Sequence, residues 1–302
     1  MRFDRYGGPE VLYVAEVEVP RPSAGEVLVA IRAAGVNPGE AAIREGYLDA
    51  AFPATFPSGE GSDLAGIVTE TGDDVRAFAP GDQVLGWTDE RASHAGYVTV
   101  PESHLVRKPE GVSWSVAGSL CVVATTAFAA VRAVGAGRGD TVAVSAAAGG
   151  VGSFAVQLLK VRGAEVIGIA SEANHEWLRS VGVTPVAYGD GLADRIRALA
   201  PGGVDAFIDT FGPEYVKLAA ELGVEPNRIE TIIAFDAAKE IGAKTDGSGT
   251  AASADVLAEM TDLVASGAIT VPIAATYPLD QVRGAYAQVE KRHTRGKVVL
   301  IP

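Results

Sequence analysis

A run of small residues between a strand and a helix constrains the fold of this 302-residue chain most strongly. The segment Ala146–Gly152 reads AAAGGVG; it follows the apolar segment Thr141–Ser145 and precedes the apolar, helix-forming segment Phe154–Leu159. A second apolar segment, Glu165–Ala170, comes directly after that helix. A strand, a turn, a helix and a second strand make a β-α-β unit, which builds parallel sheets covered by helices.

The turn also has the composition of a phosphate-binding loop. The N–H groups in the first turn of a helix lack partners inside the helix, and small residues let a pyrophosphate reach them. A turn that only packs a helix closely on a sheet would look similar, but the strand, helix and strand around it favour a dinucleotide site. The residues predicted to contact the pyrophosphate are Ala148, Gly149, Gly150, Val151 and Gly152.

The end of the second strand indicates which dinucleotide is bound. Sites for NAD commonly carry an acid there, which binds the ribose 2′-hydroxyl group. This chain has Ser171, whose hydroxyl group can donate to a phosphate, and Glu172 follows it. NADPH is therefore favoured over NADH, although no Arg or Lys lies between Arg162 and Arg179. In the alternative interpretation, Ser171, Asn174 and His175 only cap a helix.

The chain around this turn divides into two parts. The first ~110 residues contain short predicted strands at Val27–Ile31 and Gly66–Glu70, and a turn followed by a strand over Gly81–Gly86. A predicted helix over Ser115–Val134 begins an alternation of strands and helices, which indicates a doubly wound parallel sheet. The predicted strands of that sheet are Thr141–Ser145, Glu165–Ala170, Val183–Ala187, Val204–Asp209 and Arg228–Ile233. The fold class is α/β, with a β-rich, partly open barrel as a second domain.

The C-terminal segment departs from this alternation. It contains predicted strands at Val271–Tyr277 and Lys297–Ile301, with a helix over Asp280–Lys291 between them. We expect the two strands to return to the first domain.

Composition narrows the function classes. The 25 Lys and Arg residues against 38 Asp and Glu residues leave a formal net charge of −13, which repels nucleic acids and anionic lipid surfaces. One cysteine, Cys121, and four histidines argue against a zinc or iron–sulfur site. No secretory signal or membrane span is visible, so we expect a soluble, cytoplasmic protein.

Several motifs in a fixed order resemble the zinc-free quinone oxidoreductase branch of the medium-chain dehydrogenase/reductase superfamily. The resemblance covers essentially the whole chain. The motifs are AAGVNPGE at 33–40, GSDLAG at 61–66, GDQV at 81–84, TTAF at 125–128, the glycine-rich turn, and GKVVL at 296–300.

This resemblance implies a GroES-like domain of residues 1–112, completed by 271–302, and a Rossmann domain of residues 113–270. It also implies a homodimer. In the zinc alcohol dehydrogenases of the superfamily, a Cys stands where this chain has Asn37 and a His where it has Ser62. Without these ligands an alkoxide is hard to stabilise. The expected function is therefore NADPH-dependent hydride transfer to a quinone or an α,β-unsaturated carbonyl compound, without a metal.

The resemblance assigns roles to single residues. Asn37 and Tyr47 are the predicted catalytic residues, and Tyr47 and Trp87 would line the substrate pocket. The predicted cofactor contacts outside the turn are Thr126, Ser171, Asn174, Tyr188, Phe211, Gly212 and Lys297. Asn37 as an ordinary turn residue, Tyr47 and Trp87 as packing aromatics, and Phe211-Gly212 as an ordinary loop stay open alternatives.

Two other functions also stay open. One is the reduction of an enoyl thioester or of a biosynthetic intermediate. The other is a nicotinamide-binding protein without turnover, with a crystallin-like or regulatory role.

Overall fold

Two compact units make up the chain, and the computed structural model describes all of residues 1–302. Unit 1 consists of Met1–Val122, Ser253–Ala265 and Pro272–Pro302, and unit 2 of Val123–Ala252 and Ser266–Val271. None of the helices combines the length and the apolar character that a membrane crossing needs.

Unit 1 is built around one long strand, β1 (Glu26–Val36). Its apolar side chains are buried along most of its length, and it pairs antiparallel with β2, β4 and β12. Six strands follow the order β11-β12-β1-β2-β3-β5. The seventh strand, β4, pairs with β1 outside this order. The remaining elements of unit 1 are β2 (Asp63–Thr71), β3 (Gln83–Trp87), β4 (Tyr97–Pro101), β5 (Leu105–Arg107), β11 (Ile273–Pro278), β12 (Lys297–Ile301), α1 (Pro38–Arg44), α2 (Trp114–Ala117), α9 (Ala254–Ala265) and α10 (Val282–Glu290).

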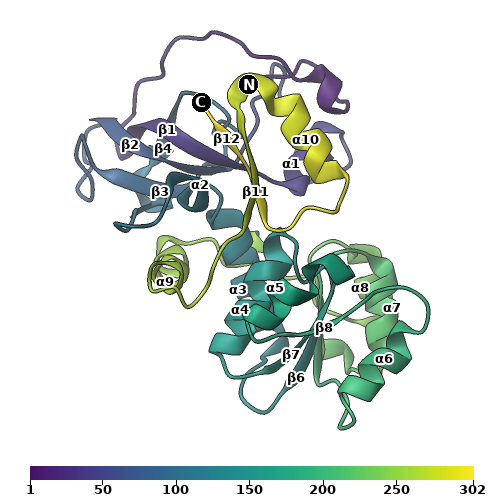
Figure 1. The fold of residues 1–302 in the computed structure, drawn as a ribbon. Coiled ribbons are helices and arrows are strands. Elements are labelled where there is room, and N and C mark those ends of the chain that lie inside the picture. The colour runs from purple at the N-terminus through teal and green to yellow at the C-terminus, as the bar shows by residue number, and fades with distance from the viewer. The chain divides into compact units, whose positions relative to one another are not determined.

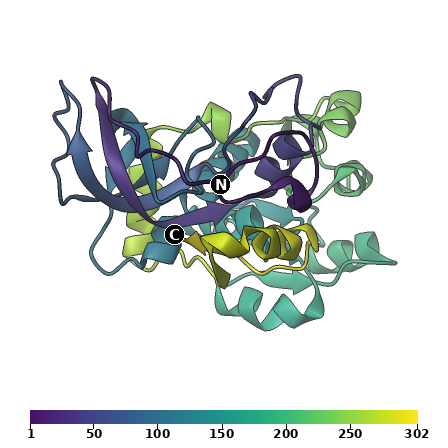
Figure 2. The ribbon, with the colours of Figure 1, turned by 90° about the horizontal axis from the view of Figure 1, so that it is seen from above.

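The C-terminal strands complete this sheet. β12 lies between β11 and β1, with Ala34 opposite Leu300 and Val36 opposite Val298. Figures 1 and 2 show the yellow C-terminal segment beside the purple strand β1, and both chain ends lie in unit 1.

Unit 2 is a five-stranded, wholly parallel sheet in the order β10-β9-β6-β7-β8 (Figure 1). Its strands are almost continuously apolar because helices cover both faces. One face packs Ile167, Phe207 and Ile229 into a cluster with Tyr215 of α7. The elements are β6 (Thr141–Val144), β7 (Glu165–Ile169), β8 (Thr184–Val186), β9 (Ala206–Asp209), β10 (Ile229–Thr231), α3 (Cys121–Val134), α4 (Gly150–Val161), α5 (His175–Ser180), α6 (Leu192–Leu199), α7 (Pro213–Glu221) and α8 (Phe235–Ile241).

The structure differs from the sequence prediction in local detail. The helix predicted over Ser115–Val134 is interrupted between α2 and α3. A Cβ on Gly118 would lie 2.3 Å from the carbonyl oxygen of Ala33, so the backbone packs directly on β1 there. The expected domain boundary after residue 112 and that before residue 271 also differ from the observed units, because α2 and α9 group with unit 1.

Candidate functional site

The glycine-rich turn connects β6 to α4 in unit 2. Gly149 is the N-cap of α4, and no side chain caps this helix. Ala146 has a left-handed φ of 42°, and its carbonyl oxygen accepts from the N–H of Gly149 at 2.8 Å. Because α4 begins at Gly150, the N–H groups of its first turn have no acceptor within the helix. Together with the helix dipole they suit an anion such as a pyrophosphate.

Gly152 has a second reason to be glycine. A Cβ on this residue would lie 2.2 Å from the carbonyl oxygen of Ala146 and 3.1 Å from the Cα of Ala147. A Cβ on Gly149 would lie 3.2 Å from the same oxygen, which is tight but less severe. Part of the glycine requirement therefore comes from the close approach of α4 to its own turn.

A buried carboxylate joins the turn to the neighbouring strand end. Asp209, at the end of β9, accepts a hydrogen bond from Ser145 Oγ at 2.6 Å and another from Thr231 Oγ1 at 2.7 Å. Its Oδ1 also accepts from the N–H groups of Phe211 and Gly212, at 2.9 and 3.1 Å. Burial raises the pKa of Asp209, and these hydrogen bonds act in the opposite direction.

Sequence reasoning did not single out Asp209. Its role depends on Ser145, 64 positions away, and no local pattern reports that contact. The only signal in the sequence was an acid at the end of an apolar strand. Phe211 itself packs edge-to-face on Tyr215, with ring centroids 5.7 Å apart.

Ser171 and Tyr188 follow two adjacent strands of the same sheet. Ile169 of β7 pairs with Val186 of β8, so the residues two positions further on emerge side by side. Asn174 Nδ2 donates to Ser171 Oγ at 3.0 Å, which leaves the Ser171 hydroxyl hydrogen free to donate elsewhere. Tyr188 is half exposed. The polar cap and the phosphate donor are thus compatible interpretations of the same residues.

A second group of polar side chains is buried in unit 1, around Asn37. The amide Nδ2 of Asn37 donates to Glu40 Oε1 at 3.0 Å and to Asp63 Oδ2 at 3.1 Å. Its Oδ1 accepts from the ammonium group of Lys297. Both amide hydrogens are used, so in this geometry Asn37 has no N–H left for a substrate carbonyl.

Further residues extend this group. Tyr286 donates to Glu40 Oε2 at 3.1 Å, and Arg44 forms a buried ion pair with Glu60 at 3.1 Å. Burial raises the pKa of Asp63 and of Tyr286, and it lowers the pKa of His94. Within the chain, no group of three or more His, Cys, Asp and Glu side chains is arranged to hold a metal ion.

Comparisons with known proteins agree with this architecture. Residues 23–110 match the alcohol dehydrogenase GroES-like domain, and residues 180–300 match the zinc-binding dehydrogenase domain. The mitochondrial NAD(P)H oxidoreductase RTN4IP1 of Mus musculus is 30% identical over 98% of this chain and 87% of its own length. The chain belongs to the quinone oxidoreductase branch of the medium-chain dehydrogenase/reductase superfamily.

Two further relatives illustrate the branch. The chloroplastic NADPH-dependent alkenal/one oxidoreductase of Arabidopsis thaliana is 30% identical over 99% of this chain and 78% of its own length. The solved quinone oxidoreductase from Coxiella burnetii superposes with a TM-score of 0.90; it is 28% identical and covers 100% of this chain and 98% of that one.

One residue that the quinone oxidoreductase resemblance assigns to the cofactor has its hydrogen-bond partners within unit 1. Lys297, a predicted cofactor contact, is buried in unit 1. Its Nζ donates to Val36 O at 3.2 Å and to the side chains of Asn37 and Asp63. An ammonium group has three hydrogens, and these three acceptors use them. The ammonium group of Lys297 is therefore engaged within unit 1, and its contact with the cofactor stays a prediction.

The remaining predicted residues differ in how far they are exposed to solvent. Tyr47 is 79% exposed, on the turn after α1. Trp87 is buried at the end of β3 and stacks on His104 with ring centroids 4.4 Å apart, which favours packing over the expected pocket wall. Thr126 is buried on α3.

Proposed function

We propose that this protein reduces quinones or α,β-unsaturated carbonyl compounds with NADPH as the hydride source. The observation that carries the proposal is the uncapped N-terminus of α4 beside the Ser171–Asn174 pair. Two anion-accepting positions on adjacent strand ends suit a dinucleotide with an additional ribose phosphate. The membership in the quinone oxidoreductase branch, with a relative named as NADPH-dependent, supports the same choice.

The residues present fit such a cofactor. The N–H groups at Gly150, Val151 and Gly152 would hold the pyrophosphate, and Ser171 would donate to the ribose phosphate. Asp209 fixes the backbone of Phe211 and Gly212. A bound NADPH would supply a hydride. The accompanying proton comes from water or from an accessible hydroxyl group such as that of Tyr47.

The test measures loss of NADPH absorbance with a panel of acceptors: a simple quinone, an alkenal, an enone and an enoyl thioester. We expect turnover with the quinone or with the enone and alkenal, and faster turnover with NADPH than with NADH. Deuterium placed on the transferring position of NADPH should appear on the β-carbon of a reduced enone, which identifies hydride transfer.

Other outcomes would contradict the proposal. Turnover restricted to the enoyl thioester would assign the protein to thioester reduction. NADPH binding, seen as enhanced cofactor fluorescence, without consumption of any acceptor would indicate a nicotinamide-binding protein without turnover. No binding at all would remove the dinucleotide site.

A further inference from the structure

One arginine of unit 2 lies against the loop that carries Tyr188. Arg195, on α6, donates from Nη2 to the carbonyl oxygens of Ala187 at 2.9 Å and Gly189 at 3.2 Å. Its Nη1 donates to the carbonyl oxygen of Asp190 at 2.6 Å. The two carbonyl groups bound by Nη2 flank Tyr188 in the sequence. The guanidinium group thereby fixes the backbone on both sides of this tyrosine.

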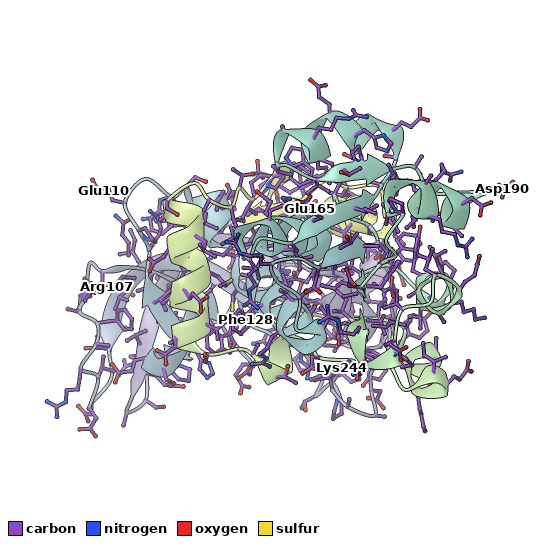
Figure 3. The ribbon with its side chains drawn as sticks, turned by 90° about the horizontal axis from the view of Figure 1, so that it is seen from below. Arg107, Glu110, Phe128, Glu165, Asp190 and Lys244 are labelled. Carbon is purple, nitrogen blue, oxygen red and sulfur yellow. The ribbon has the colours of Figure 1, made fainter.

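The loop is shaped to surround this cation. Gly189 and Gly191 have φ angles of 101° and 73°, a conformation that other residues rarely adopt, and the resulting turn directs successive carbonyl groups inward. Asp190, labelled in Figure 3, lies at the outer margin of unit 2, and its side chain is exposed. Its backbone carbonyl group belongs to this turn and accepts from Arg195.

The guanidinium group is not fully satisfied by these contacts. It has five N–H donors, and the loop uses three of them. The Nε atom is inaccessible to solvent and has no acceptor in the protein. A partly buried cation with unused donors raises the positive potential of its surroundings and favours an anion nearby.

The position of this cation matters because of its neighbours. Tyr188 and Ser171 emerge side by side from β8 and β7, and Ser171 is the predicted donor to a ribose phosphate. The segment around Ser171 carries no Arg or Lys between Arg162 and Arg179. Arg195 places a positive charge against the loop that follows β8, the strand next to β7.

We propose that Arg195 is a specificity-determining positioning residue, which holds Tyr188 and biases the site toward a dinucleotide with a phosphorylated adenosine ribose. This inference rests on the proposed function. Arg195 acts through the loop and through its charge, and no direct contact with the phosphate is required.

The experiment compares the dissociation constants of NADPH and NADH, measured by cofactor fluorescence, for the wild type, Arg195→Gln and Arg195→Lys. We expect Arg195→Gln to weaken NADPH binding about tenfold and NADH binding much less. Arg195→Lys keeps the charge but loses the planar guanidinium group with its several donors, so it should retain part of the preference for NADPH over NADH. Arg197→Gln is the matched control, because Arg197 lies on the same helix but pairs with Asp194 and Glu221.

Each outcome is decisive. Equal weakening of both dinucleotides by Arg195→Gln would overturn the specificity role and leave only a structural one. A wild type that binds NADH as tightly as NADPH would overturn the inference as well. A wild type that binds neither dinucleotide would overturn the proposed function itself. A thermal melt of each variant shows whether it is folded. If Arg195→Gln is unfolded, Arg195→Lys is compared with the wild type in its place.

Discussion

At the scale of single residues, the site depends on close contacts that tolerate few substitutions. Gly152 and Asp209 show two kinds of constraint. The position of Gly152 has no room for a methyl group, and the carboxylate of Asp209 accepts hydrogen bonds from several donors at once. Neither constraint involves a bound molecule. Their loss should therefore change stability as well as binding.

We expect Gly152→Ala to destabilise the protein by about 1–3 kcal/mol, because the new methyl group would lie 2.2 Å from Ala146 O and push α4 away from its turn. The free energy of unfolding in urea measures this. Gly137→Ala is the control, since a Cβ there would meet nothing closer than 3.9 Å. Equal stability of the two variants would show that the turn can relax.

We expect Asp209→Asn to cost about 2 kcal/mol, because an amide presents N–H groups to donors that the carboxylate accepts from. It should also weaken NADPH binding, since the backbone at Phe211 and Gly212 loses its anchor. Calorimetry and a binding titration test both effects. Asp236→Asn, at an exposed position on α8, should change neither.

Glu230 makes the stability depend on pH. Burial, followed by the nearby Asp246, raises its pKa to about 9. A raised pKa favours the protonated form in the folded state. The stabilisation is therefore complete below about pH 4.5, the ordinary value, and is lost as the pH rises toward 9.

Glu230→Gln should remove this dependence and make the variant more stable than the wild type at pH 8. Unfolding free energies from pH 5 to 9 measure it, and the difference between the two proteins should grow by at most ~1.4 kcal/mol per pH unit. The exposed Glu225→Gln is the control. Parallel pH profiles for the wild type and Glu230→Gln would show that Glu230 is ionised in the folded protein.

At the scale of elements, a buried ion pair joins β12 to β2, and the same lysine binds the end of β1. Lys297 Nζ lies 3.5 Å from Asp63 Oδ2 of β2 and donates to the carbonyl oxygen at the end of β1. Three segments that are distant in the sequence thus meet at one ammonium group. Removing a single partner would leave a buried charge without compensation.

We expect Lys297→Met to destabilise unit 1 by about 3–5 kcal/mol. The double variant Lys297→Met/Asp63→Asn should recover part of the loss, because it removes the stranded carboxylate as well. Denaturant unfolding of the two single variants and the double variant gives the coupling energy. Additive effects in this cycle would contradict a direct interaction between the two charges.

The elements that the sequence predicted are those with a strong local pattern. The five parallel strands were found because buried parallel strands are continuously apolar, as in Val142–Val144. The sequence pattern did not predict the helix α1 or the strands β4 and β5, because each has only three to seven residues and so carries a weak periodic signal. Lys297 is a predicted cofactor contact because it lies in the GKVVL motif of the family resemblance, whereas its acceptors come from two other segments of unit 1, Val36-Asn37 and Asp63.

At the scale of the whole molecule, the two units use the chain differently. Unit 2 takes most of its residues from one continuous stretch, whereas unit 1 needs segments from both ends of the chain. Deletion of residues 297–302 should therefore unfold unit 1, since β11 would lose its only partner strand and the end of β1 would lose β12. Tryptophan fluorescence reports this through Trp87 and Trp114, with Trp177 in unit 2 as an internal reference. Deletion of the exposed Pro302 alone should leave the spectrum unchanged.

The place of β12 in the sheet also sets an order of events during synthesis. Lys297 and Val36, which it contacts, are 261 positions apart, so the sheet of unit 1 stays incomplete until β12 has left the ribosome. Unit 2 has emerged by then and can fold first. The nascent β1, whose sheet is still open, must meanwhile avoid pairing with other chains. Pairing of β12 with β1 therefore ends the interval in which this part of β1 is open to strands of other chains.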